Sequence, residues 1–224
     1  MASHIFDWLK RIAIRLLLLY RRARYGYAFR RIRMAQPKYA IVDPEDYQRL
    51  SKYEWEARRA RNSPFYAARQ DVNPKTRKYK LIFMHREIIE IGDGLFADHI
   101  NHKTFDNRKA NLRPATQTQN NRNRRKFSGP SKSKYKGVYW KPQINKWVAQ
   151  IGVNKKVIHL GCFKKQKAAA KAYDKAAKKY HGQFACLNFP PSRLKSLIKR
   201  IKITTNEHEK NEENLVLSYR HHFL

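Results

Sequence analysis

The stretch from Asp98 to Asn123 reads DHINHKTFDNRKANLRPATQTQNNRN and holds the densest set of chemically capable side chains in the sequence. An Asp-His pair opens it, a polar loop rich in Asn and Arg follows, and Asn120 and Asn123 come after the apolar Leu112. Mg²⁺ prefers hard oxygen ligands and takes only one or two carboxylates from a protein. Asp98 offers a carboxylate and Asn120 an amide oxygen, so the stretch predicts a metal site.

His99 supplies the complementary function, because an unperturbed imidazole titrates near neutral pH and can take a proton from water. Together with Asp98 and Asn120 it predicts a centre that activates water and polarises a phosphodiester. Two alternatives are an ordinary Asn-rich loop and a degenerate, inactive copy of such a centre.

In these residues the chain resembles the nuclease motif of HNH homing endonucleases, which have a ββα-metal fold. The resemblance implies strands over 95–101 and 112–116, a loop over 102–111 and a helix over about 117–126.

The same resemblance implies a role for each matching side chain. His99 is expected to be the general base, while Asp98 and Asn120 hold one catalytic Mg²⁺ or Mn²⁺ and no other small-molecule cofactor is needed. Asn111 is expected to brace the loop by hydrogen bonds. The remaining positions that match the family pattern are Asn107, Arg108, Arg113, Asn123 and His85, the last without an assigned role.

The net charge of +33 on 224 residues, from 50 basic and 17 acidic side chains, predicts a polyanionic partner. The charge is uneven: residues 41–97 carry 11 basic and 9 acidic side chains, whereas residues 127–190 carry 14 and 1. Two cysteines, Cys162 and Cys186, are too few for a disulfide framework, and both are expected to be small core residues of a protein in a reducing compartment.

Residues 1–37 form a basic N-terminal extension. Its apolar run from Ile12 to Tyr20 contains Arg15 and is too short to span a membrane, and no small-residue cleavage site follows it. An unstructured extension and a basic amphipathic helix that touches DNA or a membrane surface are both open, as is Met34 as the functional start. A cytoplasmic, non-secreted protein is expected.

Residues 38–126 are expected to form the nuclease domain, beginning with a small α+β portion. KYAIVD predicts a strand, Pro44 begins a turn or short helix, and two alternating segments predict a hairpin around Asn73-Pro74. The expected core residues of this portion are Trp55, Phe65, Tyr66, Leu81 and Phe83.

Residues 127–134, with Gly129-Pro130 and three serines, predict a linker. In 135–190, YKGVYW, KWVAQIGVN and KKVIHLGCF predict three strands, and KKQKAAAKAYDKAAKKYHG predicts a helix capped by Gly182. Alternation predicts that Trp147, Ala149 and Ile151 pack on that helix, which leaves an open face with Lys146, Val148 and Gln150. Residues 191–224 predict a short basic helix and a mobile tail.

Through YKGV, KW-A-I, HLG-F, AAAKAYDKAA and LNF, this region resembles the AP2/ERF DNA-binding domain. The resemblance implies a three-stranded antiparallel sheet packed on one helix, with the sheet in the major groove of duplex DNA. It assigns base reading to Lys136, Tyr139, Lys141, Gln150 and His159, and a phosphate contact to Lys146. Because residues 127–190 contain no arginine, the GC-rich sites of plant members are not implied.

These patterns predict an α+β endonuclease of the HNH type that cuts double-stranded DNA at a site positioned by an AP2-like domain, in the nucleoid or a phage-infected host cell. Two rivals remain: a non-enzymatic AP2-type transcription regulator with a degenerate nuclease motif, and an RNA-directed protein. The target site, the oligomeric state and nicking versus double-strand cleavage are left open.

Overall fold

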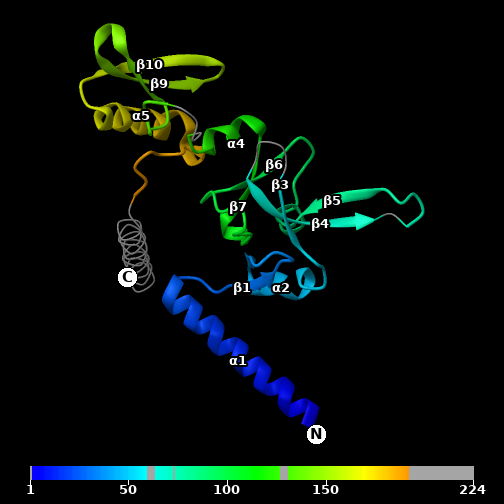
Figure 1. Cartoon of the computed structure of the whole chain (residues 1–224). Helices are drawn as coiled ribbons and strands as arrows, with labels where there is room; N and C mark the ends of the chain where they lie inside the picture. The colour runs from blue at the N-terminus through cyan, green and yellow to red at the C-terminus, as the bar shows by residue number, and fades with distance from the viewer. Residues whose placement is uncertain (1, 60–63, 73, 127–130, 192–224) are drawn as a thin grey trace, which may run out of the picture. The chain divides into compact units, whose positions relative to one another are not determined.

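The computed structural model describes residues 2–59, 64–72, 74–126 and 131–191, and the chain divides into two compact units (Figure 1). The first unit comprises residues 1–127 and 181–185, and the second comprises residues 128–180 and 186–224. The turn at Asn73, the Gly129-Pro130 step of the expected linker and the expected basic helix after Pro191 lie outside the described residues.

The first unit combines one long helix and several short ones with three small antiparallel sheets, ordered β1-β2, β3-β4-β5 and β6-β7. Its elements are α1 (Ala2–Tyr25), β1 (Arg30–Arg33), β2 (Tyr39–Val42), α2 (Pro44–Leu50), β3 (Glu56–Arg59), β4 (Phe65–Val72), β5 (Tyr79–Phe83), α3 (Met84–Ile88), β6 (Phe96–His99), η1 (Lys109–Asn111), β7 (Leu112–Ala115), α4 (Gln117–Asn123) and η3 (Gly182–Phe184).

Most of the expected N-terminal extension is the 24-residue helix α1, so it is helical rather than unstructured. Within the described residues, no helix is both long enough and apolar enough to cross a bilayer.

The core of the first unit centres on Trp55, which is 1% exposed and donates its indole N–H to the Leu50 carbonyl at 2.7 Å. Val42, Leu50 and Met84 pack in the same cluster. Two expected core residues are wrong, because Phe65 and Leu81 are 43% and 37% exposed. On β4 the small side chains of Ala67 and Ala68 are the buried ones instead.

β6 and β7 form an antiparallel hairpin in which Asp98 lies opposite Arg113 and His99 opposite Leu112. Both strands are shorter than expected. α4 begins at a capping box, in which the Thr116 hydroxyl accepts from the Gln119 N–H at 3.2 Å and the Gln119 amide oxygen accepts from the Thr116 N–H at 2.8 Å. The helix ends at Asn123, three residues earlier than the resemblance implied.

The second unit has one antiparallel sheet, ordered β10-β9-β8, and the helix α5. Its elements are β8 (Val138–Lys141), η2 (Pro142–Ile144), β9 (Lys146–Val153), β10 (Lys156–Phe163) and α5 (Gln166–His181). Asn154 and Lys155 join β9 to β10 with φ of 49° and 63°, the left-handed values of a tight hairpin turn. Val138 and Ala149 of the sheet pack with Ala169 and Ala170 of the helix, because alanine lets a helix approach a sheet closely.

The two cysteines lie in different environments: Cys186 is buried as expected, but Cys162 is exposed. The expectation that both are core residues is therefore wrong for Cys162, which lies on β10.

Candidate nucleic-acid interface

The second unit leaves one face of its sheet uncovered by α5. Side chains alternate between the two faces of a strand, so the face opposite Val138 and Ala149 carries every second residue of β8 and β9. Lys141 lies opposite Lys146, and Gln150 lies opposite His159. The predicted DNA-contacting side chains that the strand register gathers on this open face are Tyr139, Lys141, Lys146, Gln150 and His159.

A bulge in β10 keeps His159 on that face together with Cys162. The register shifts between His159 and Gly161, and Gly161 adopts φ of 119°, which disfavours a side chain. Residues three apart on a regular strand would point to opposite faces, but here the Cys162 Sγ lies 3.7 Å from the His159 Nε2. The alternation of side chains along a regular strand does not predict that His159 and Cys162 lie together, because it does not include the bulge.

Val148 was expected to be exposed on the open face of the sheet, but it is buried. It is only 1% exposed, although it shares a strand side with Lys146 and Gln150. It lies on the central strand, opposite Tyr139 of β8 and Cys162 of β10. Side chains from both neighbouring strands flank it, so the open face has an apolar centre with polar and basic side chains around it.

Gly137 fixes the entry to β8. Its φ is +72°, and a Cβ at this position would lie 2.0 Å from Cδ2 of Tyr173 on α5. Only glycine lets the backbone approach the Tyr173 ring this closely. Burial raises the pKa of the Tyr173 phenol, and nearby Cys186 and Asp174 raise it further. The Gly137 carbonyl also accepts from the Gln150 N–H at 2.9 Å.

Lys136, the sixth predicted DNA contact, precedes β8 and is half-buried. Its backbone N–H donates to the Asn188 side-chain oxygen at 2.7 Å, and its carbonyl accepts from the Asn188 amide at 3.1 Å. The segment that closes the unit therefore fixes the backbone from which this lysine projects.

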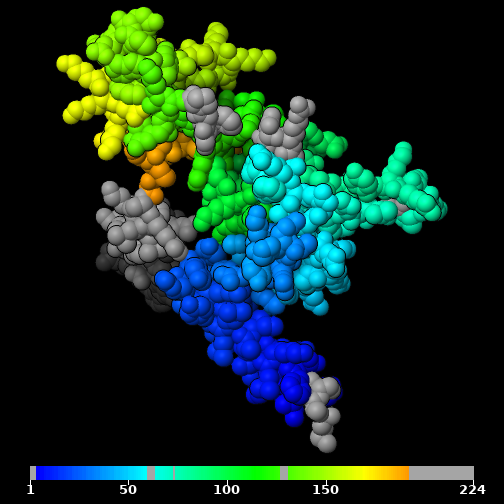
Figure 2. All heavy atoms as spheres, viewed as in Figure 1, coloured from blue at the N-terminus to red at the C-terminus, as the bar shows by residue number. Residues whose placement is uncertain are grey.

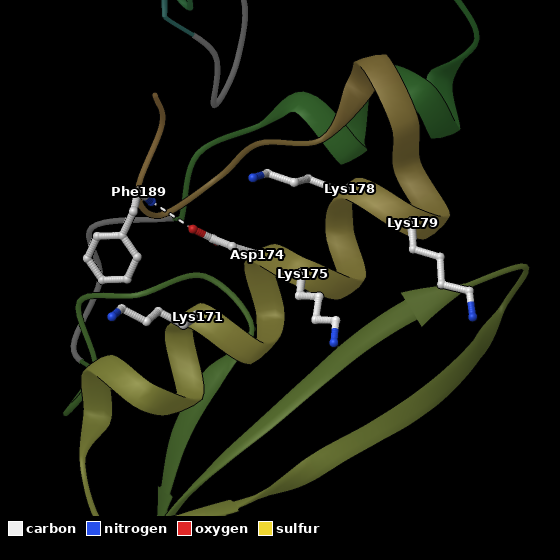
Figure 3. Close-up of a pocket in the computed structure, with 6 residues that line it drawn as sticks. All are labelled: Lys171, Asp174, Lys175, Lys178, Lys179 and Phe189. Atoms are coloured by element: carbon white, nitrogen blue, oxygen red, sulfur yellow. Dashed lines mark hydrogen bonds between the residues drawn. The ribbon is translucent and has the colours of Figure 1, made fainter. Parts of the chain in front are cut away.

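Asp174 and Asn188 form a clamp that residue-by-residue reading did not single out. The buried Asp174 carboxylate accepts from the Asn188 N–H at 2.8 Å and from the Asn188 side-chain amide at 3.1 Å. It also accepts from the Phe189 N–H at 2.8 Å (Figure 3). The sequence feature that could have indicated this clamp is the LNF element, which contains both Asn188 and Phe189.

The side of α5 away from the sheet is also basic. Lys171, Lys175, Lys178 and Lys179 line a shallow hollow with Asp174 and Phe189, as the close-up shows (Figure 3). The Asp174 carboxylate is already engaged in the clamp. Both sides of the second unit therefore carry lysines, but those of α5 lie on the side away from the open sheet face.

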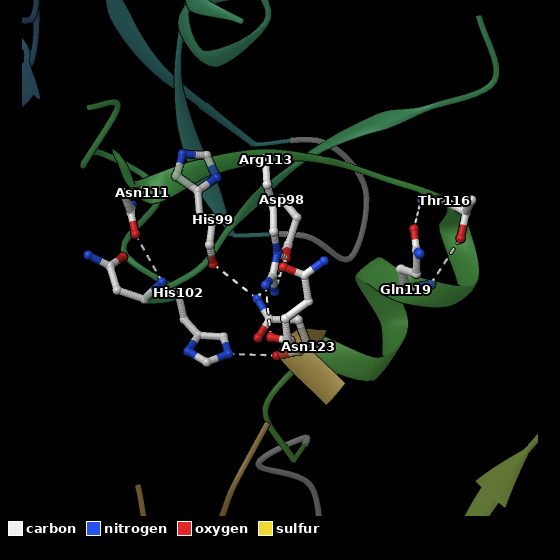
Figure 4. Close-up of polar contacts among 10 residues, drawn as sticks. Asp98, His99, His102, Asn111, Arg113, Thr116, Gln119 and Asn123 are labelled. Atoms are coloured by element: carbon white, nitrogen blue, oxygen red, sulfur yellow. Dashed lines mark hydrogen bonds and ion pairs between the residues drawn. The ribbon is translucent and has the colours of Figure 1, made fainter. Parts of the chain in front are cut away.

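In the first unit, Asp98 is held by protein partners. It is 3% exposed; its Oδ2 accepts from the Arg113 Nε at 2.8 Å, and its Oδ1 accepts from the Asn123 amide at 2.8 Å (Figure 4). The Arg113 Nη1 also donates to the Gln183 carbonyl at 2.8 Å, within the same unit.

The loop between β6 and β7 is braced by its own polar side chains. The Asn111 amide donates to the Asp106 carbonyl at 2.7 Å, and its oxygen accepts from the Asn101 N–H at 3.0 Å. Burial alone would raise the pKa of Asp106, but hydrogen bonds and charge from Arg108 bring it below its usual value. The polar residues of the motif thus have a structural role in holding this loop.

His99 lies in a buried ring cluster. Its Nε2 lies 3.1 Å from the Asn107 Oδ1, and its ring centroid lies 5.2 Å from that of His85. Tyr66 and Phe83 pack on His85 with centroids at 5.2 and 5.5 Å. Burial lowers the pKa of His99 and lowers the pKa of His85 to about 3, so both imidazoles favour the neutral form.

The Asp98 carboxylate, one of the two predicted metal ligands, is not a vacant oxygen site. The Asp98 oxygens already accept hydrogen bonds, and the adjacent guanidinium repels a cation. Asn120 is half-buried on α4, where its carbonyl accepts from the Arg124 N–H at 3.1 Å. Asp98, as it is held here, does not fit a divalent ion, and the expected Mg²⁺ or Mn²⁺ stays an untested prediction.

In the described part of the chain, a different group has carboxylate oxygens within 4.8 Å of one another: Asp43, Glu45 and Asp46. Lys109 occupies this group, since its N–H donates to the Asp43 Oδ2 at 2.7 Å and its Nζ lies 3.4 Å from the Asp46 Oδ2. The contacts with Lys109 give the cluster a structural explanation.

Comparison with known proteins identifies a family for the second unit. The AP2 domain family matches residues 133–183. The AP2-like ethylene-responsive transcription factor AIL6 of Arabidopsis thaliana is 36% identical over 118 residues, which cover 45% of this chain and 20% of that protein. AIL5, another AP2-like ethylene-responsive transcription factor of that plant, is 46% identical over 74 residues, covering 31% and 13%. The ethylene-responsive transcription factor WRI1, also of A. thaliana, is 40% identical over 81 residues, covering 34% and 19%. The chain therefore spans at most a fifth of the length of these relatives.

These findings contradict the prediction of a metal-dependent HNH endonuclease. The matched family is the AP2 domain, and the relatives are named as transcription factors rather than nucleases. The enzymatic reading is therefore wrong, and the ββα-metal nuclease fold and phage-infected host gain no support from the comparisons. The structure supplies a physical reason for the error at Asp98 and His99, because both side chains are buried and engaged in structural contacts.

The match agrees with the geometry described above: a three-stranded antiparallel sheet on one alanine-rich helix, with the opposite sheet face open. The family match therefore supports an AP2 domain at residues 133–183 of this chain.

Proposed function

We propose that this protein is a DNA-binding transcription regulator that reads duplex DNA through the open face of the β8-β9-β10 sheet. The observation that carries the proposal is the register of that sheet, which places Tyr139, Lys141, Lys146, Gln150 and His159 on one face while α5 covers the other. The AP2-type relatives named as transcription factors support it.

The side chains on this face divide into two roles. Lys141 and Lys146 end β8 and begin β9, are exposed, and fit phosphate oxygens at the rim of the groove. Gln150 and His159 are paired across β9 and β10, farther along the sheet. A glutamine side chain can bond an adenine edge with two hydrogen bonds, so a site that includes adenine suits Gln150.

The test begins with selection of binding sites from random duplexes by the full chain. On the selected site, Gln150→Ala is expected to weaken binding roughly 10- to 100-fold, while binding to random duplex changes little, because a base contact is lost. Lys141→Ala with Lys146→Ala is expected to weaken binding to all duplexes and to reduce the slope of log affinity against log salt by about 2.

The matched control is Lys171→Ala with Lys175→Ala, which removes the same charge from the helix side of the domain. If this pair lowers the salt slope as much as the sheet pair does, the sheet is not the DNA-binding face. Structured RNA that binds as tightly as the selected duplex favours the RNA-directed rival. A reporter gene carrying the selected site then tests regulation, which the Gln150→Ala variant is expected to lose.

A further inference from the structure

Helix α1 presents a large apolar surface to solvent. The most exposed large apolar side chains are Ile5, Phe6, Trp8, Leu9, Leu16, Leu19 and Tyr20, each at 50–64% exposure. Ile5, Leu9 and Leu16 are four and seven residues apart, so they share one side of the helix. Burial of such side chains away from water is favourable, and α1 does not gain this stabilisation while the surface remains in water.

Basic side chains flank the apolar surface. The helix carries six basic residues and one acidic residue, Asp7. Arg11, Arg15 and Arg22 are also four and seven residues apart and form a stripe on another side of the helix. The helix therefore combines an apolar side that carries Ile5, Leu9 and Leu16 with a basic stripe, and Trp8 lies at the edge of that stripe, seven residues from Arg15.

Near its C-terminal end α1 is joined to the chain that follows it. The Arg21 Nη1 donates to the Phe29 carbonyl at 2.6 Å, and the Arg21 guanidinium lies 4.4 Å from the Phe29 ring centroid. The space-filling view shows the side chains of the N-terminal half clear of the rest of the first unit (Figure 2). The apolar residues in this half thus remain available to a partner.

We propose that α1 is an interfacial anchor that lies in the surface of a membrane containing anionic lipids. An amphipathic helix of this composition places its apolar side at the headgroup–acyl boundary and its arginines at lipid phosphates. Duplex DNA would satisfy only the basic side. A second copy of the helix would cover the apolar side but would bring two strongly basic rims together. A membrane surface satisfies both sides, and this role goes beyond the proposed DNA binding.

The test is flotation of the full chain with phosphatidylcholine vesicles, with and without about one third phosphatidylglycerol, in excess duplex DNA that occupies the AP2 sheet. The informative variant is Phe6→Gln with Leu9→Gln and Leu16→Gln, which leaves the net charge unchanged. The matched control is Tyr79→Gln with Val72→Gln, which alters two side chains that are 69% and 57% exposed on β5 and β4 of the first unit. Binding to the selected duplex verifies that each variant retains its folded DNA-binding domain.

The native protein and the control pair are expected to float with anionic vesicles, and the triple variant is expected to partition at least about tenfold less. A fluorescence blue shift on vesicle binding that disappears in Trp8→Phe is expected as well. Failure of the native protein to float, or equal flotation of the triple variant, overturns the proposal. So does a vesicle-free dimer, measured by sedimentation velocity, that the triple variant dissociates.

Discussion

Asp98 in the first unit and Asp174 in the second are both buried aspartates, at 3% and 7% exposure, but their carboxylates have different partners. Asp98 accepts from the Arg113 guanidinium and the Asn123 amide. Asp174 accepts from two backbone N–H groups and the Asn188 amide. One carboxylate is neutralised by a cation, whereas the other is held by neutral donors.

The difference shows how little a carboxylate's sequence context says about its role. Asp98 lies beside His99 in a motif that resembles a catalytic centre, yet it fastens a hairpin to α4. Asp174 lies among lysines on α5, where a solvated charge is the ordinary expectation, yet it closes the AP2 domain. Both residues are structural clamps, and the energetic consequence of removing each depends on what is left behind.

The largest effect is expected when the ionic clamp is broken on one side. Asp98→Ala leaves Arg113 largely buried without its carboxylate, which typically costs about 3–5 kcal/mol of the free energy of unfolding. Native-state hydrogen exchange, followed separately for the two units, measures this loss in the first. The double variant with Arg113→Leu is expected to recover part of it. A loss below about 1 kcal/mol in Asp98→Ala contradicts the structural role.

The next largest effect is expected where the backbone of the second unit packs tightly against a side chain, at Gly137. Gly137→Ala places a methyl group against Tyr173 at a φ of +72°, and a cost of about 3 kcal/mol is expected from overpacking and backbone strain. Gly152→Ala is the control, because a Cβ there meets nothing within 4 Å. Chemical denaturation measures the free energy of unfolding of each single variant. Equal stability of Gly137→Ala and Gly152→Ala contradicts the expected clash with Tyr173.

A smaller loss is expected when the neutral clamp is broken. Asp174→Ala leaves the N–H groups of Asn188 and Phe189 without their acceptor, at a cost of about 2 kcal/mol. Asp174→Asn retains one acceptor oxygen and is expected to lose less. Hydrogen exchange of the Asn188 and Phe189 amides reports the clamp directly. Unchanged protection of both amides in Asp174→Ala would show that the carboxylate does not hold them.

The smallest effect is expected when the pH is lowered from 7.0 to 5.5, which should destabilise the first unit more than the second. The pKa of His85 falls from 6.5 to about 3 on folding because the ring is buried, so between these values the unfolded chain binds more protons than the folded chain. Stability of the first unit is therefore present above pH 6.5 and falls with decreasing pH, by at most about 1.4 kcal/mol per pH unit for this group. The raised pKa of Tyr173 affects the second unit only at alkaline pH.

Thermal unfolding at pH 7.0 and 5.5 checks this difference, with His85→Phe as the variant in which the acid sensitivity of the first unit is expected to shrink. Phenylalanine keeps a ring beside Phe83 but cannot bind a proton. An identical pH dependence in the native and His85→Phe proteins rules out His85 as its source.

The elements of the second unit follow closely from local sequence patterns. Alternation in KWVAQIGV and the alanine spacing in KAAAKAYDKAA predict strands, a helix and the side on which Ala149 packs. The same patterns failed at Val148 and Cys162, because burial of a central-strand residue and the effect of a β-bulge depend on neighbouring strands. In the first unit, Pro44 marked the start of α2 correctly, but local patterns overestimated the burial of Phe65 and Leu81.

The sequence by itself determined the strongly basic charge, the order of strands and helices in the AP2 domain and the amphipathic spacing of α1. These depend on residue types and on separations of a few positions, which the backbone periodicities convert directly into faces. Only the tertiary structure decided what Asp98 and His99 do. Arg113 and Asn123 lie 15 and 25 residues beyond Asp98, and only the β6-β7 hairpin and α4 bring them to its carboxylate, where their donors replace water.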